Sequence, residues 1–410
     1  MNKRMDRNRL NIGAYILQPY ARSEAHIRDV AECGIDFIVC MENDRPALDL
    51  FHKYGVGAIV SGIVPGWWGG DGGNAGQFAE GHPLDKYEAA AAAFVDHPAI
   101  WGIDVGDEPS ALDFPHFGKV IDCVNRAFPN QFAYLNLYPN YASVSQNNAE
   151  ETVNQLGTPT YAEHIRRYCQ YIPSDYLCYD FYLYSINVTN HLENLRIVAD
   201  ACRNTGRSMW IILQVNSVDP NVWMSENNLR FQAYTSMAFG AENITWGCYT
   251  AGWWHNEVLD KEGNKTQQYD KLKKINAEIR VIAEEYMRYR RVSTHFVGYP
   301  AGHEDMAAVQ QEAVESLSTG VFFDVKAEGG APLVVGEMVN RSADGSAALM
   351  ICAADAPHEV DPKEYAVTFR APGRCIRALG GNGYRPVSLL GDGVYAVTVK
   401  SNEGILITAR

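Results

Sequence analysis

The sequence predicts a (β/α)8 TIM barrel followed by a C-terminal antiparallel β-sandwich, which is an α/β fold with two domains. Short apolar runs alternate with helical stretches over roughly 280 residues, near the ~250 typical of this barrel, and the apolar runs number eight. Beyond about residue 295 the helical spacing gives way to alternating strands broken by Asp-Gly and Asn-Gly turns, which is typical of a sandwich. We therefore expect the barrel over residues 8–293 and the sandwich over residues 294–410.

The eight runs expected to form the barrel strands are rich in apolar, β-branched or aromatic residues. In chain order they lie at 11–17, 35–41, 56–63, 100–106, 132–138, 176–184, 209–215 and 244–250. Helical segments separate them. One begins after Ser23, a predicted N-cap, and ends at Gly34, and a long one at 269–291 follows the eighth run.

A doubly wound open sheet is the competing layout, because it produces the same alternation of strands and helices. Its support is the run GDGGNA at 70–75, which has the form GxGxxA of a pyrophosphate-binding loop. This run follows the third apolar segment rather than the first, and it adjoins Trp67 and Trp68. We therefore interpret it as a loop lining a site, and we favour the barrel.

The charge balance excludes two classes of partner. The chain has 410 residues, with 35 Lys and Arg against 49 Asp and Glu, a formal net charge of -14. Because no basic block offsets this charge, we expect neither nucleic acid nor a membrane surface as a partner.

The apolar stretches are far shorter than the roughly 18 residues of a membrane helix, and no signal segment is visible. We expect a soluble cytoplasmic protein, with a trimmed secreted protein as the alternative and a homo-oligomer left open.

The cysteines and histidines do not suggest a metal site or a disulfide framework. Nine cysteines are scattered between Cys33 and Cys375 without a CxxC pair. The 11 histidines are dispersed, and no group of His, Asp and Glu has the spacing of metal ligands. We therefore expect buried thiols, no metal and no cofactor.

The fourth run ends in WGIDVGDEPS, which places a carboxylate at a strand tip. Barrels of this kind build their active sites at the carboxyl ends of the strands. Strand alternation back from Glu108 places Gly106, Asp104 and Gly102 on one face, and Pro109 forces a turn after it. We predict that Glu108 is a functional carboxylate in the largest cleft. The alternative is that residues 107–110 only cap the next helix.

Aromatic and amide side chains fall at or just after the predicted strand ends. Flat aromatic faces flanked by amides and hydroxyls suit a sugar, which presents apolar C–H faces and a rim of hydroxyls. The alternative for each single aromatic residue is core packing. As a set they predict a carbohydrate-binding cleft, and the candidate substrate-binding residues, with Glu257 added from the loop after the eighth run, are Trp67, Trp68, Asn136, Tyr138, Tyr182, Gln214, Trp253, Trp254, His255 and Glu257.

The residues GDEP at the end of the fourth run resemble the Asn-Glu-Pro that ends the fourth strand of clan A (β/α)8 glycoside hydrolases. Residues 229–254 are similar to the passage through the eighth strand of family 42-like β-galactosidases and related gut bacterial enzymes, and residues 336–355 resemble their C-terminal β-sandwich. The resemblance covers most of the chain. It implies a glycoside hydrolase in which Glu108 is the general acid/base.

The seventh run departs from that family. Clan A enzymes carry a nucleophilic Glu at the end of the seventh strand, whereas this run reads MWIILQVNS and places Gln214 there. An amide cannot form a glycosyl ester, so a second carboxylate is needed. We rank Asp180 first, because a carboxylate within an apolar strand needs a partner or a purpose. The alternative for Asp180 is a buried acid that accepts hydrogen bonds from tyrosines. The further candidates are Glu257, Glu42, Asp44 and Asp260.

These observations predict a glycoside hydrolase acting on a sugar or oligosaccharide, with Glu108 as the general acid and Asp180 as the second carboxylate. Because Asp180 lies two strands from Glu108, we expect a gap of roughly 6.5 to 9.5 Å that holds a water, and hence inversion. Two alternatives remain. One is a catalytically inactive carbohydrate-binding barrel, and the other is a sugar lyase or isomerase that uses the same carboxylates.

Overall fold

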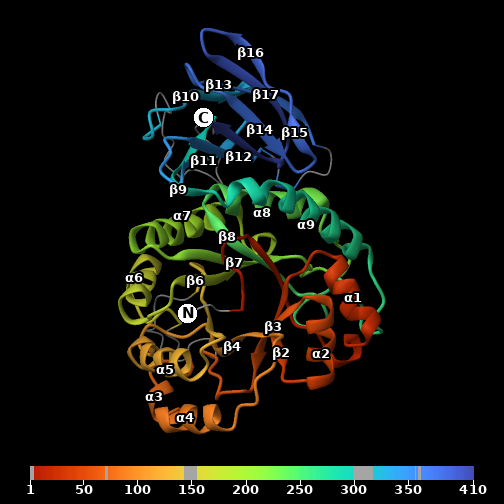
Figure 1. The fold of residues 1–410 in the computed structure, drawn as a ribbon, viewed down its shortest axis with the longest axis vertical. Coiled ribbons are helices and arrows are strands. Elements are labelled where there is room, and N and C mark those ends of the chain that lie inside the picture. The colour runs from red at the N-terminus through yellow and green to blue at the C-terminus, as the bar shows by residue number, and fades with distance from the viewer. Residues whose placement is uncertain (1–3, 70–72, 143–154, 299–316, 356, 359–361) are drawn as a thin grey trace.

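The predicted barrel is confirmed. The computed structural model describes residues 4–69, 73–142, 155–298, 317–355, 357–358 and 362–410. Eight parallel strands close into a barrel, and helices surround it (Figure 1). β1 pairs with both β2 and β8, so the ring of strands has no free edge and the open-sheet alternative is wrong.

Every predicted run overlaps an observed barrel strand. The strands are β1 (Asn11–Tyr15), β2 (Phe37–Glu42), β3 (Gly57–Ser61), β4 (Ile100–Asp107), β5 (Phe132–Leu137), β6 (Tyr176–Phe181), β7 (Ser208–Gln214) and β8 (Ala241–Gly247). The helices are α1 (Glu24–Glu32), α2 (Arg45–Tyr54), α3 (Phe78–Gly81), α4 (Leu84–Ala92), α5 (Phe114–Ala127), α6 (Tyr161–Tyr171), α7 (Val188–Thr205), α8 (Glu226–Ala238) and α9 (Gln267–Tyr286).

Local chemistry accounts for where the helices begin and end. The hydroxyl of Ser23 accepts a hydrogen bond from the His26 N–H, which caps α1 as predicted. The helix after the eighth strand was expected to reach residue 291, but α9 ends at Tyr286 and β9 (Tyr289–Val297) follows. Pairing of β9 with β11 supplies its backbone hydrogen bonds, so tertiary structure overrides the helical pattern there.

The C-terminal region is the predicted sandwich of two antiparallel sheets. One sheet has the order β15-β14-β18-β12-β11-β9 and the other β10-β13-β17-β16. The bounds are β10 (Phe323–Ala327), β11 (Leu333–Asn340), β12 (Ala347–Ala353), β13 (Glu364–Arg370), β14 (Ile376–Gly380), β15 (Gly383–Arg385), β16 (Ser388–Gly391), β17 (Val394–Lys400) and β18 (Gly404–Ala409). The expected domain boundary between residues 293 and 294 falls inside β9.

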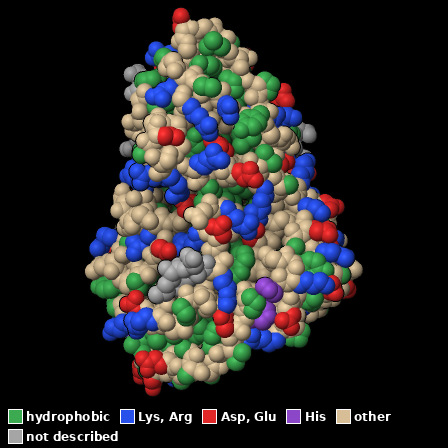
Figure 2. Space-filling view, viewed as in Figure 1, with side chains coloured by type: hydrophobic (Ala, Val, Ile, Leu, Met, Phe, Trp, Pro, Cys, Tyr) green, Lys and Arg blue, Asp and Glu red, His purple; other side chains and the backbone are tan. Residues whose placement is uncertain are grey.

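The sandwich rests on the helices that follow β6, β7 and β8 (Figure 1). A Cβ atom on Gly336 of β11 would lie 2.0 Å from the carbonyl oxygen of Ala238, at the end of α8, so the two backbones meet closely there. Charged side chains of both signs cover the visible face of the molecule (Figure 2). Among the described residues, no helix has the length and apolar character to cross a membrane.

Aromatic side chains fill the amino-terminal half of the barrel interior. The rings of Tyr176 and Trp210 stack with centroids 4.0 Å apart, and Phe132 meets both edge-on. These side chains are almost fully buried. Polar groups inside the barrel therefore gather toward the carboxyl ends of the strands.

Candidate active site

Two consecutive acids, Asp107 and Glu108, end β4 and both reach other polar groups of the barrel mouth. Neighbouring side chains of a regular strand point to opposite faces. Here the pairing of β4 with β5 is bulged between Asp104 and Gly106, and Glu108 has a φ of 47°, in the left-handed region. The expected alternation from Glu108 back to Asp104 is therefore wrong, because the bulge and the left-handed residue both interrupt it.

The amide of Asn136, on β5, joins the acids of β4 and β6. Its Nδ2 atom donates to Asp107 Oδ1 at 3.0 Å and to Asp180 Oδ1 at 2.7 Å. Asn136 and Asp180 are each 3% exposed. Asn136, which the sequence predicted to bind substrate, thus holds two carboxylates in place.

Glu108 lies near Asp180, and a side-chain interaction between them is one of the smaller influences that lower the pKa of Asp180. The expected separation of roughly 6.5 to 9.5 Å between the two carboxyl groups stays a prediction. Asp180 stands at the end of β6, and the left-handed backbone of Glu108 lets its side chain reach across to it.

Burial raises the pKa of the acids in this cluster. It raises the pKa of Asp180, and the nearby charge of Asp107 raises it further. Burial also raises the pKa of Asp107, and it raises that of Asp104 to about 7 although the Ser61 hydroxyl donates to Asp104 at 2.7 Å. Among the described residues, no Lys or Arg is a cause of these shifts. The site therefore retains protons near neutral pH without a compensating cation.

Three predicted aromatic residues form one wall beside Asp180, which we call the aromatic wall: Tyr182, Trp253 and Trp254. The Tyr182 ring lies edge-on to Trp254 at 4.9 Å and to Trp253 at 5.7 Å between centroids. Burial and the charge of Asp180 raise the pKa of Tyr182. The three side chains are partly exposed, so they present ring surface at the mouth.

The segment that contains Trp67 and Trp68 runs alongside the end of β4. The carbonyl oxygen of Trp67 accepts from the Asp107 N–H at 2.7 Å, and the Trp67 ring packs against Phe78 rather than into the mouth. Trp68 is 54% exposed, whereas Tyr138 is buried. Residues 70–72 of the GxGxxA run lie outside the described residues.

Gln214 serves as a structural link. Its Oε1 accepts from the Tyr184 N–H at 2.9 Å, and its Nε2 donates to the Asn216 carbonyl at 3.1 Å. The side chain is fully buried and joins the turns after β6 and β7. Its amide is therefore already occupied by the protein.

The remaining predicted residues stand apart from the acid pair. His255 is exposed and its backbone pairs with that of Ser217. The charge of Glu257 raises the pKa of Tyr20, so Glu257 lies toward the loop after β1. Other residues line the described cavities of about 320 to 400 Å³, and the expectation that Glu108 lies in the largest cleft stays a prediction.

Three residues of the mouth were missed by sequence reasoning: Asp104, Asp107 and Tyr15. The signal for Asp107 was the adjacent acid pair in GDEP, which was interpreted only as a possible helix cap. Burial raises the pKa of Tyr15, and the charge of the nearby Asp107 raises it further. Among the described residues, no group of three or more His, Cys, Asp and Glu side chains could hold a metal ion.

Comparison with known proteins identifies the fold. No family model matches the chain, and no curated protein matches it. The chain is similar to a cycloisomaltooligosaccharide glucanotransferase from Paenibacillus sp., complexed with cycloisomaltoheptaose, at 9% identity and a TM-score of 0.55 over 98% of this chain and 85% of that one. It is also similar to α-galactosidase I from Mortierella vinacea, at 10% identity and a TM-score of 0.51 over 98% and 97%. At these identities the likeness shows a shared fold.

Proposed function

We propose that the chain is a glycoside hydrolase that cleaves a glycosidic bond of a sugar or oligosaccharide, with Glu108 and Asp180 as its catalytic carboxyl groups. The observation that carries the proposal is the cluster of buried carboxyl groups at the barrel mouth, where Asn136 joins Asp107 to Asp180 and Glu108 lies near Asp180. Glycosidases need one protonated and one ionised carboxyl group beside the scissile bond. In this proposal Glu108 supplies the protonated form and Asp180 the ionised form.

In the proposed mechanism Glu108 is the proton donor and Asp180 is the nucleophile. Glu108 gives its proton to the leaving oxygen as the glycosidic C–O bond breaks, while a carboxylate oxygen of Asp180 bonds to the anomeric carbon. Glu108, now ionised, then takes a proton from water, whose oxygen displaces Asp180. The closeness of the two groups supports this double displacement, because retaining enzymes hold their carboxyl groups nearer together than inverting ones do.

Other residues of the mouth would orient these two groups and the sugar. Asn136 fixes the Asp180 carboxylate and lowers its pKa, which favours the ionised form that attack requires. The aromatic wall offers ring faces to the C–H faces of a sugar. The two solved structures of the same fold, named as a glucanotransferase and an α-galactosidase, agree with a sugar substrate.

The experiment is a screen of the full chain against nitrophenyl glycosides and oligosaccharides, followed by two variants. We expect Glu108→Gln and Asp180→Asn each to lower kcat/KM by at least ~100-fold, the lower range for loss of an acid or base. The matched controls are Glu88→Gln on α4 and Asp122→Asn on α5, both at exposed helical positions. We expect these to keep full activity.

The outcomes separate the proposal from its alternatives. Unchanged turnover in Glu108→Gln would contradict the assignment of the proton donor. Saturable sugar binding without turnover across the panel would instead support the inactive carbohydrate-binding barrel. Elimination products with an unsaturated sugar ring would support the lyase.

A further inference from the structure

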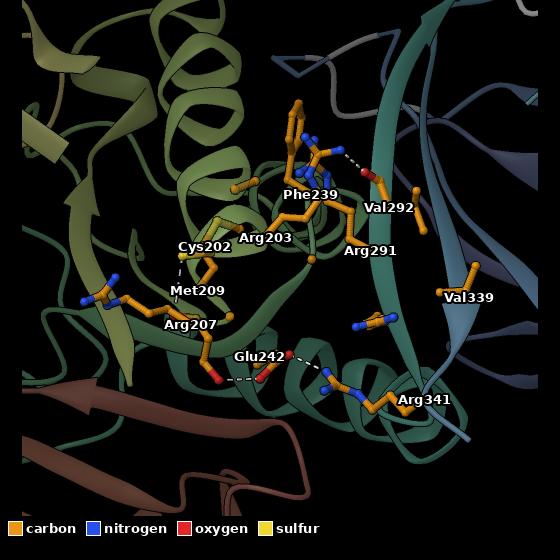
Figure 3. A pocket seen from close by; sticks show the side chains of 15 residues that line it. Cys202, Arg203, Arg207, Met209, Phe239, Glu242, Arg291, Val292, Val339 and Arg341 are labelled. Carbon is orange, nitrogen blue, oxygen red and sulfur yellow. Dashed lines mark hydrogen bonds and ion pairs between the residues drawn. The ribbon is translucent and has the colours of Figure 1, made fainter. Parts of the chain in front are cut away.

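A cavity of about 390 Å³ lies at the amino-terminal end of the barrel, away from the acid pair (Figure 3). It is enclosed by the end of α7, the starts of β7 and β8, and strands β9 and β11 of the sandwich. This volume falls within the roughly 300 to 1,000 Å³ of small-molecule sites. A single acid, Glu242, lines it beside five arginines, which are Arg203, Arg207, Arg290, Arg291 and Arg341.

Three of these arginines are already bound to other groups. Arg291 pairs with Asp200 at 3.0 Å, and Arg341 pairs with Glu242. Glu242 also accepts from the Ser208 hydroxyl at 2.5 Å. Arg207 donates to backbone carbonyls around residues 169–174, and Figure 3 shows its guanidinium directed away from Arg203 and Arg291.

The other two arginines leave positive charge without a carboxylate partner. Arg203 donates to the Val292 carbonyl at 2.7 Å, and within the described part of the chain neither it nor Arg290 forms an ion pair. Figure 3 shows the ends of Arg203 and Arg291 side by side. Burial lowers the pKa of Arg291, its ion pair with Asp200 raises it, and the nearby charge of Arg203 lowers it by a smaller amount. Like charges held together in a partly buried site disfavour each other unless an anion lies between them.

We propose that this cavity binds a small multivalent oxyanion, a phosphate-bearing or polycarboxylate compound no larger than about a sugar phosphate. The planar guanidinium fork matches the oxygens of phosphate and carboxylate groups. Such an anion would contact Arg203 on the barrel side and Arg290 on the sandwich side. The site is unexpected in a chain of net charge -14, where the average field repels anions.

Binding would join the two domains, because the arginines belong to both. α7 is part of the barrel layer, whereas β9 belongs to the six-stranded sheet of the sandwich. A ligand that binds the folded state alone raises its stability in proportion to the logarithm of the ligand concentration over Kd. We therefore expect the anion to raise the Tm of the whole chain.

The test is isothermal titration calorimetry of the full chain with pyrophosphate in one arm and citrate in the other, at an ionic strength held constant with NaCl. We expect saturable binding in at least one arm, and at least a tenfold rise in Kd for Arg203→Gln/Arg290→Gln. Arg203 and Arg290 have no carboxylate partner among the described residues, so their replacement leaves no acid without an ion-pair partner. The control is Arg28→Gln/Arg377→Gln, which removes the same charge from exposed positions outside the cavity.

Binding of pyrophosphate alone supports a phosphate ligand, binding of citrate alone supports a polycarboxylate, and binding of both supports the class. Absence of saturable binding in both arms overturns the proposal. So does an equal loss of affinity in the control variant, which indicates a diffuse charge effect. Glu108→Gln should bind the anion unchanged, so the result is independent of the proposed hydrolase activity.

Discussion

The amide nitrogen of Asn136 lies 2.7 Å from Asp180 Oδ1, within a carboxylate cluster that contains no described cation. This hydrogen bond lowers the pKa of Asp180, whereas burial and the charge of Asp107 raise it. The Asn136 amide is the largest of three influences that oppose protonation of Asp180, and the others are the backbone of Asp180 and the side chain of Glu108. The ionised form of Asp180 therefore depends on Asn136.

Replacement of Asn136 should change the pH dependence of catalysis. In Asn136→Ala the pKa of Asp180 rises, because a donor to its ionised form is lost. We expect the acid limb of the kcat/KM profile to move to higher pH, with the activity loss larger at pH 5.5 than at pH 8. Asn130→Ala, at an exposed position, should keep the profile of the unmodified chain. An activity loss that is the same at every pH would show that Asn136 acts on packing alone.

The first-formed sugar should keep the anomeric configuration of the substrate. The closeness of Glu108 and Asp180 favours the roughly 5 to 5.5 Å of retaining enzymes over the wider gap of inverting ones. Proton NMR of the fresh product measures the configuration. In Asp180→Ala, azide should restore turnover of an activated aryl glycoside and yield a glycosyl azide of opposite configuration. An inverted first product from the unmodified enzyme would restore the water mechanism.

The acid cluster should disfavour negatively charged substrates. Asp104, Asp107 and Asp180 surround the proposed reaction centre, and the causes of their pKa shifts include no cation among the described residues. A substrate carboxylate at ~6 Å from an ionised acid costs about 2.8 kcal/mol at an effective dielectric constant of 20. We expect kcat/KM for a uronide to be at least tenfold below that of the matching neutral glycoside with the same leaving group. A uronide that reacts faster would contradict this description of the site.

The barrel was predictable from the sequence because its signals are local, whereas the site geometry depends on contacts between distant segments. Apolar runs and caps such as Ser23 act within a few residues. Glu108 and Asp180 could be found from their places at strand ends. Their closeness could not, because it needs the bulge of β4 against β5 and the left-handed backbone of Glu108. The structural use of Gln214 likewise depends on Tyr184 and Asn216, whose turns meet only after folding.

The stability of the chain should depend on pH through Asp104. Its pKa is raised from 3.8 to about 7, so the folded state binds more protons than the unfolded state between these values. The contribution of Asp104 to stability is therefore fully present below pH 3.8 and is lost as the pH rises through about 7. Three pKa units correspond to ~4 kcal/mol, and we expect about half of this because Asp104 is partly exposed.

Replacement of Asp104 tests this contribution. In Asp104→Asn the side-chain oxygen can still accept from Ser61, but the ionisation is lost. Relative to the unmodified chain, the variant should gain about 2 kcal/mol of unfolding free energy between pH 4.5 and pH 7.5 in denaturant titrations. Asp122→Asn serves as the exposed control. Parallel stability curves for Asp104→Asn and the unmodified chain would show that Asp104 titrates normally.

A single methyl group at Gly69 should displace Glu108. A Cβ atom there would lie 2.0 Å from the Glu108 carbonyl oxygen and 2.6 Å from the Tyr138 hydroxyl, so the segment or the tip of β4 must move. The hydrogen bond from the Gly69 N–H to the Asp107 carbonyl, at 3.1 Å, ties the two segments together and transmits the shift to both acids. Since a misplacement of ~1 Å can cost ~100-fold in rate, we expect Gly69→Ala to lower kcat by at least tenfold. The matched control is Gly66→Ala, where a Cβ meets no atom within 4 Å. Equal kcat values for the two variants would show that the position of Glu108 does not depend on its contact with Gly69.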